Sequence, residues 1–143
     1  GRGGAIYNNG TLNITDSAFS GNSGGGIWNE RGLLTISNST FSSNSAGDGG
    51  GGIWNERGLL TISDSTFSDN SANQGGGILN KGDLTIANST FSGNVAHNGG
   101  GISNRGSLVI ANSAFSNNSS DGNGGGIDNA GSLTIADSTY SGN

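Results

Sequence analysis

The sequence predicts an all-β protein, a right-handed parallel β-helix (β-solenoid) of six coils, each about 24 residues long with three short strands. A Gly-Gly-(Ala/Gly)-Ile motif recurs six times, and an aromatic residue follows each copy at a nearly fixed distance. Between them, apolar and polar residues alternate as they do in strands. One stretch, GGGIWNERGLLTIS, occurs twice without a difference. Fixed-period self-similarity is the signature of a repeat architecture, so residues 1–143 are interpreted as one β-helix array.

The spacing of the motifs locates the variable part of each coil. Successive motif isoleucines are 21, 26, 25, 24 and 25 residues apart. The aromatic residue follows its isoleucine by 13 or 14 residues, whereas the next isoleucine follows the aromatic residue by 8 to 12. Length variation therefore lies in one loop, rich in Ser, Asn, Asp and Gly. The aromatic column is Phe19, Phe41, Phe67, Phe91, Phe115 and Tyr140.

The fourth coil shows the expected strands most clearly. Residues 77–80 predict a short strand, Gly82 separates it from a second strand over residues 84–87, and residues 90–92 form a third. No segment has the 10–12 residues of helical periodicity that an α/β repeat requires. Stacking such coils about 4.8 Å apart places equivalent Ile, Leu and Phe residues above one another. Six stacked coils can bury columns that one coil cannot, which explains folding with only 29% hydrophobic residues.

Two columns of asparagine are as regular as the apolar ones. Stacked asparagines can hydrogen-bond along a column, and asparagine tolerates the left-handed conformations of turns. Because every coil carries them, we interpret them as structural ladders rather than ligands for a metal or a sugar. One column follows the motif isoleucines: Asn8, Asn29, Asn55, Asn80, Asn104 and Asn129. The other follows the aromatic residues: Asn22, Asn44, Asn70, Asn94, Asn118 and Asn143.

The paired motifs resemble those of a known family. GGAI at residues 3–6, GGGI in the other five coils, and FSGN, FSSN, FSDN, FSGN, FSNN and YSGN at the aromatic residue are similar to the GGAI and FxxN motifs of chlamydial polymorphic outer membrane proteins. The resemblance covers the whole chain. It implies a right-handed β-helix that belongs to a secreted surface protein with an adhesive role.

Composition argues against several other classes of protein. A net charge of −5 disfavours nucleic-acid binding, and no run approaches the roughly 20 apolar residues of a membrane helix. The acidic residues are scattered, and the column Asp16, Asn38, Asp64, Asn88, Asn112 and Asp137 alternates in a way that avoids stacked like charges. His97, the only histidine, falls in a variable loop. We therefore expect no enzyme activity, no cofactor and no metal site, although some carbohydrate-active enzymes share this fold.

Two outward columns are the expected interaction surface. The residues after the first four motif isoleucines form an apolar stripe: Tyr7, Trp28, Trp54 and Leu79. Such a stripe marks a contact surface unless a loop folds over it, and the sequence leaves both open. A neighbouring column, Arg31, Arg57, Lys81 and Arg105, stacks like charges, which Glu30 and Glu56 or a partner's carboxylates would answer.

The function expected from these features is a non-enzymatic, extracellular or cell-surface structural or adhesive solenoid. Neither end resembles a cap, because residues 1–6 open directly on a coil and residues 139–143 close directly on one. Bare ends recruit other chains, so we expect head-to-tail stacking of copies into a filament, or membership of a longer array.

Two alternative functions remain at this stage. One is carbohydrate recognition through the Trp28 and Trp54 stripe, with surface glycans or a host receptor as partners. The other is ice binding through an outward row, Asn13, Thr35, Thr61, Thr85, Val109 and Thr134. The neighbouring row is irregular, and one threonine column is what a β-branched strand position provides anyway.

Overall fold

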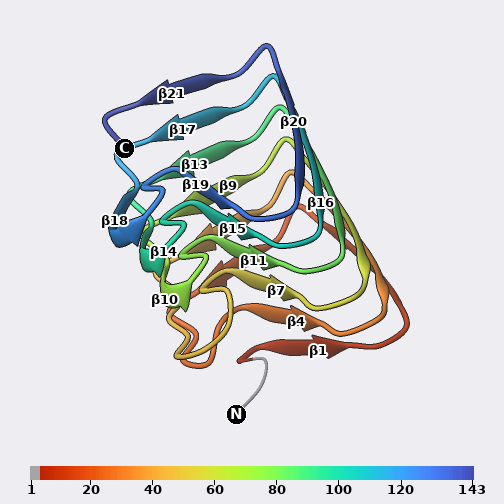
Figure 1. The fold of residues 1–143 in the computed structure, drawn as a ribbon. Coiled ribbons are helices and arrows are strands. Elements are labelled where there is room, and N and C mark those ends of the chain that lie inside the picture. The colour runs from red at the N-terminus through yellow and green to blue at the C-terminus, as the bar shows by residue number, and fades with distance from the viewer. Residues whose placement is uncertain (1–3) are drawn as a thin grey trace.

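The structure, a computed structural model, describes residues 4–143 and confirms the predicted fold. These residues form 21 strands that wind into six stacked, roughly triangular coils of a right-handed parallel β-helix, with β1 at one end and β21 at the other (Figure 1). Residues 1–3, which include the first glycine of the opening motif, lie outside the described residues.

Three six-stranded parallel sheets form the sides of the helix. The first sheet contains β1 (Ile6–Asn8), β4 (Ile27–Asn29), β7 (Ile53–Asn55), β11 (Ile78–Asn80), β15 (Ile102–Asn104) and β19 (Ile127–Asn129). The second contains β2 (Thr11–Thr15), β5 (Leu33–Ser37), β8 (Leu59–Ser63), β12 (Asp83–Ala87), β16 (Ser107–Ala111) and β20 (Ser132–Ala136). The third contains β3 (Ala18–Ser20), β6 (Thr40–Ser42), β9 (Thr66–Ser68), β13 (Thr90–Ser92), β17 (Ala114–Ser116) and β21 (Thr139–Ser141).

Equivalent residues of successive coils pair directly, as the repeat predicts. Ile78 is in register with Ile53 below and Ile102 above, and Phe91 with Phe67 and Phe115. The phenylalanine rings stack nearly parallel with centroids 4.7 to 4.8 Å apart, which equals the strand spacing of a sheet. The core is therefore a set of continuous Ile, Leu and Phe columns, fully buried in the middle coils.

In the second to fifth coils, close packing favours glycine at the last position of the motif, which Ala5 occupies in the first coil. A Cβ added to Gly77 would lie 2.6 Å from the carbonyl oxygen of Gly101 and 3.1 Å from the ring of Phe91, with no positive φ involved. Gly52 and Gly101 meet the same two obstacles in their coils. The glycine columns thus let the backbones of neighbouring coils approach one another beside the aromatic stack.

The turn between the second and third strands takes up the left-handed conformation. Its residue has φ between 47° and 51° in all six coils: Asp16, Asn38, Asp64, Asn88, Asn112 and Asp137. The ladder asparagines have no positive φ, so the expectation that they occupy left-handed turns is wrong. Asp and Asn tolerate this conformation better than other side chains do, which explains why only these two residue types alternate here.

A small fourth sheet forms in the variable loops. It contains β10 (Ser71–Gln74), β14 (Val95–Asn98) and β18 (Ser119–Asn123), and we call it the cover sheet. Figure 1 shows it beside the first sheet, near the corner where the third sheet ends. The sequence predicted only a loop in this region, because these strands lack alternating apolar residues.

Candidate functional site

Both asparagine columns form continuous hydrogen-bonded ladders. In each, the side-chain amide nitrogen donates to Oδ1 of the equivalent asparagine in the next coil, at 2.8 or 2.9 Å. The second column adds bonds to the backbone, as when Asn94 Nδ2 donates to Phe67 O. The ladder asparagines of the middle coils are fully buried, so their role as structural ladders agrees with the contacts they make.

All ten of these side-chain bonds point the same way, from the lower-numbered coil to the higher. At the C-terminal end, Asn129 Nδ2 and Asn143 Nδ2 donate only to backbone oxygens within residues 4–143, so one donor hydrogen of each is free. At the N-terminal end, Oδ1 of Asn22 accepts no hydrogen bond from these residues, although the other members of its column do. One end of the solenoid therefore offers donors and the other offers acceptors.

A third polar column was missed in the sequence. In each coil a serine two residues before the aromatic residue donates its hydroxyl to a carbonyl two residues earlier. From the second coil onward, its hydroxyl oxygen also accepts the backbone N–H of the serine in the coil below. Its signal was a serine at this position in all six coils. The column comprises Ser17, Ser39, Ser65, Ser89, Ser113 and Ser138.

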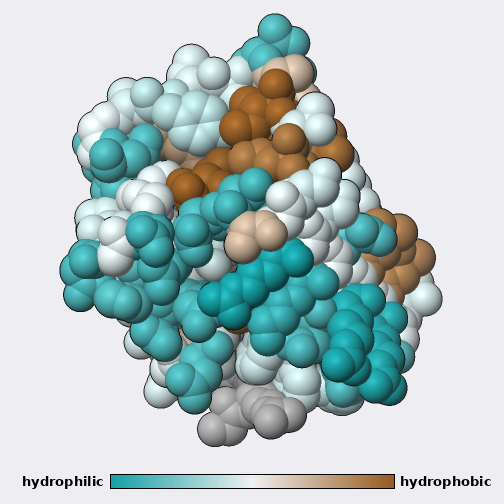
Figure 2. Space-filling view, viewed as in Figure 1, coloured by the Kyte–Doolittle hydropathy of each residue, from teal (hydrophilic) through white to brown (hydrophobic). Residues whose placement is uncertain are grey.

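The apolar core is partly exposed to solvent in the last coil. Ile135 is 43% exposed and Tyr140 41%, whereas the residues at their positions in the middle coils have no exposed surface. Figure 2 shows the resulting hydrophobic patch, surrounded by β19, β20 and β21. At the opposite end, Ile6, Leu12 and Phe19 are only partly buried. Within residues 4–143, the core columns are thus partly exposed in the first and last coils.

The apolar stripe is exposed only in the first coils. Tyr7 is 51% exposed and Trp28 and Trp54 are half-buried, but Leu79 is 1% exposed. The expectation that Leu79 belongs to an exposed interaction surface is therefore wrong, because its side chain is buried. Ser103, the next residue of the column, is fully buried as well.

The two half-buried indole rings stack on one another. Trp28 packs against Tyr7, with centroids 4.9 Å apart, and against Trp54, with centroids 5.4 Å apart. The ammonium group of Lys81 lies 5.0 Å from the Trp54 ring centroid. A sugar that stacked on either indole face would have to displace one of these neighbours.

The charged column has a different register from the one predicted. The backbone N–H of Lys81 donates to Asn55 O, as that of Glu56 does to Asn29 O, so Lys81 stands above Glu56 and not above Arg57. The predicted step from Arg57 to Lys81 is wrong, because Arg31 and Arg57 belong to a residue insertion present only in the second and third coils. The predicted step between the like charges of Lys81 and Arg105 remains. Arg105 follows Lys81 in this column.

Two carboxylates of this region, those of Glu56 and Glu30, make specific contacts with neighbouring side chains. Glu56 forms an ion pair with Lys81, with Nζ and Oε2 3.2 Å apart. Glu30 accepts a hydrogen bond from the Tyr7 hydroxyl. This bond, together with desolvation and the negative charge of Glu30, raises the pKa of Tyr7 above its usual value, while Arg31 opposes the shift.

A cleft of about 480 Å³ lies beside the tryptophans. It occurs where the loop of the second coil forms no cover-sheet strand and glycines replace side chains. Asp48 is its only charged lining residue. The lining residues are Ser23, Gly24, Ile27, Trp28, Ala46, Gly47, Asp48, Gly49, Gly50 and Trp54.

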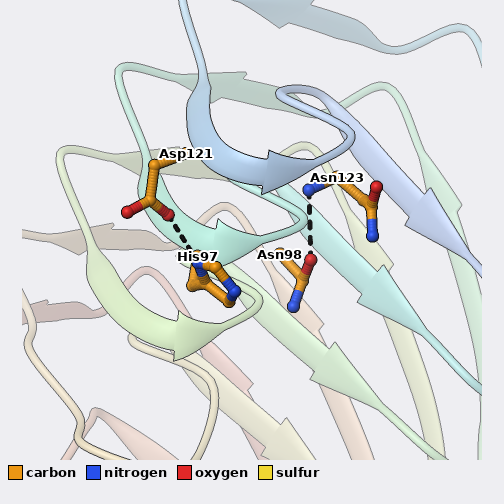
Figure 3. A network of polar contacts seen from close by, with 4 residues as sticks. All are labelled: His97, Asn98, Asp121 and Asn123. Carbon is orange, nitrogen blue, oxygen red and sulfur yellow. Dashed lines mark hydrogen bonds and ion pairs between the residues drawn. The ribbon is translucent and has the colours of Figure 1, made fainter.

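His97 lies on the cover sheet and is paired with an acid. Its Nδ1 is 2.7 Å from Asp121 Oδ1, and both side chains are largely exposed (Figure 3). Next to this pair, Asn98 Oδ1 accepts the backbone N–H of Asn123. Across residues 4–143, no three His, Cys, Asp or Glu side chains come together in a way that could hold a metal ion. No helix within that range is long and apolar enough to cross a membrane.

The fold and the ladders define a class, the right-handed parallel β-solenoids, whose regular columns extend from coil to coil. A family model described as the right handed beta helix region matches residues 2–143, and the chain belongs to this family. Searches of curated proteins and of solved structures returned no match.

Proposed function

We propose that this chain is a non-enzymatic structural and adhesive module of an extracellular or cell-surface assembly. The module acts by continuing a solenoid: its C-terminal coil receives the N-terminal coil of a second copy. The observation that carries this proposal is the common direction of both asparagine ladders, which leaves donors at one end and acceptors at the other. Head-to-tail contact pairs donors with acceptors, whereas contact between two identical ends does not.

The apolar columns support the same arrangement. If the register of the repeat continues across the junction, Ile135 meets Ile14 and Tyr140 stacks on Phe19 of the next copy. These are the contacts that Ile110 and Phe115 make with the coil below them within the chain. Burying exposed apolar surface favours association at about 25 cal/mol per Å². Further coils of one longer chain would satisfy the same end in the same way.

Stacking is tested by placing a charge on the end surface. Sedimentation velocity over a range of protein concentrations and electron microscopy of the purified 143-residue chain should show rods that lengthen with concentration. Ile135→Lys should weaken this association at least tenfold, because the ammonium group would be buried in the junction. Thr134→Lys adds the same charge to the outer face of the same strand and should leave association unchanged.

Two results of these experiments would overturn the stacking proposal. A chain that stays monomeric at high concentration would overturn the proposal, and so would equal association of the two lysine variants. Circular dichroism of each variant confirms that the β-helix is intact before association is compared.

A further inference from the structure

Three aromatic side chains form a continuous stack on the first sheet. The ring centroids of Tyr7 and Trp28 lie 4.9 Å apart, and those of Trp28 and Trp54 lie 5.4 Å apart. These residues pair in register in β1, β4 and β7, so the stack crosses three successive coils. Because the chain contains no Cys or Met, its tyrosines and tryptophans are the side chains that lose one electron most easily.

One end of this stack borders the cleft beside the tryptophans. Both indoles line that cleft of about 480 Å³, so a small oxidant can reach them there. The indole nitrogen of Trp54 is buried and donates no hydrogen bond within residues 4–143. A buried nitrogen of this kind calls for an explanation, and a redox role is one. A radical cation of Trp54 has no base in these residues to take its N–H proton, so it keeps its positive charge until a neighbouring ring reduces it.

The opposite end of the stack holds a proton acceptor. The Tyr7 hydroxyl donates a hydrogen bond to the carboxylate of Glu30. Removing an electron makes a phenol strongly acidic, so oxidation of Tyr7 moves its proton along this bond to the carboxylate. The product is a neutral tyrosyl radical. The negative charge of Glu30 also acts on Tyr7 more strongly than the opposing positive charge of Arg31 does.

The charges at the two ends of the stack favour transfer in one direction. The ammonium group of Lys81 lies 5.0 Å from the Trp54 ring centroid and raises the energy of a positive charge on that ring. Glu56, which pairs with Lys81, reduces this effect. At the other end, the carboxylate of Glu30 attracts positive charge and accepts the proton of Tyr7. An electron vacancy formed at Trp54 is therefore lowest in energy once it has moved to Tyr7.

We propose that Trp54, Trp28 and Tyr7 form a relay that carries an oxidising equivalent from the cleft to Tyr7, where it is held as a tyrosyl radical. A one-electron oxidant takes an electron from Trp54 and is itself reduced. Trp28 then reduces the Trp54 radical cation. Tyr7 in turn reduces Trp28, and the phenol proton moves to Glu30. A one-electron reductant returns the electron to Tyr7, and Glu30 returns the proton. The relay protects the indoles from oxidative damage, and it does not depend on the proposed stacking function.

Flash photolysis with photo-oxidised ruthenium tris-bipyridine as the one-electron oxidant tests the relay. In a Tyr140→Phe background every tyrosyl signal comes from Tyr7. The absorbance of the indole radical should decay at the rate at which that of the tyrosyl radical rises. Glu30→Gln should slow this transfer about tenfold, because an amide is a far weaker proton acceptor than a carboxylate. Asp48→Asn removes a carboxylate from the cleft lining instead and should leave the transfer rate unchanged.

Mass spectrometry of the chain after exposure to peroxyl radicals provides a second measurement. Tyr7→Phe should increase oxidation products at Trp28 and Trp54, because the electron vacancy then stays on the indoles. The matched control is Tyr140→Phe, since Tyr140 stacks on Phe115 and not on an indole. Equal damage to the tryptophans in the two tyrosine variants overturns the relay, and so does equally fast tyrosyl formation in the Glu30→Gln and Asp48→Asn variants. Circular dichroism confirms that each variant retains the β-helix.

Discussion

Asn70 and Asn94 are joined by two hydrogen bonds to one oxygen. The side-chain amide of Asn70 donates to Asn94 Oδ1 at 2.9 Å, and the backbone N–H of Asn70 donates to the same oxygen at 3.0 Å. Asn70 also donates to Phe41 O and accepts two bonds from Asn44. Asparagine provides this combination of two amide donors and one acceptor on a short side chain. The ladder thereby satisfies buried backbone groups of several coils.

Asn70→Ala should lower the free energy of unfolding by about 2–4 kcal/mol, because it leaves two buried donors of Asn44 without their acceptor and removes the side-chain donor to the Phe41 carbonyl. Urea titration followed by circular dichroism measures the change. Asn73→Ala, at an exposed position of β10, should change stability by less than about 0.5 kcal/mol. Equal losses in the two variants would contradict the structural role of the ladder.

Gly77→Ala should destabilise the chain by about 1–3 kcal/mol, because the new methyl group would overlap the carbonyl oxygen of Gly101 in the coil above. Gly47→Ala is the matched control, since a Cβ there meets no atom within 4 Å. Thermal unfolding of both variants measures the difference. A harmless Gly77→Ala would show that the glycine columns serve turn flexibility and not close packing of neighbouring coils.

The sequence predicted the fold because every coil repeats the same solution. Ile78, Leu84 and Phe91 recur at nearly fixed spacing, so the strands, their register and the core columns follow from counting residues. The cover sheet could not be predicted in this way. Its strands β10, β14 and β18 contain mostly polar and small residues, and they form because the underlying coils already hold neighbouring loops at the strand spacing.

The candidate site was predictable only in part. The asparagine columns were visible as repeats, but the direction of their hydrogen bonds depends on side-chain orientation, which composition does not encode. The charged column was misaligned because the insertion at Arg31 and Arg57 was counted as a regular position. Leu79 was assigned to the surface because alternation gives the side of the strand that a residue faces, not whether a later segment covers that side.

Lys81→Gln should destabilise the chain by about 0.5–1 kcal/mol, because it removes the ion pair with Glu56 and the contact with the Trp54 ring. A double-mutant cycle with Glu56→Gln isolates the pairwise term, which added salt should reduce. Arg57→Gln, an exposed change of equal charge, should have a smaller effect. If Lys81 instead stood above Arg57, Lys81→Gln would stabilise the chain, so the sign of the change tests the register.

The hydrogen bond from Tyr7 to Glu30 should be visible in a titration. The chain has two tyrosines, and burial raises the pKa of Tyr140 as well, so Tyr140→Phe leaves Tyr7 as the only reporter. In that background the pKa of Tyr7 should lie above its ordinary value of about 10, because the neutral phenol donates to Glu30 and the phenolate would be repelled by it. The contact is therefore present at neutral pH and is lost as the pH rises through the raised pKa of Tyr7.

Glu30→Gln should return the absorbance titration of tyrosinate toward the ordinary value. Glu56→Gln, one coil further away, should leave this titration unchanged. An unchanged titration in Glu30→Gln would show that Tyr7 and Glu30 do not interact in solution.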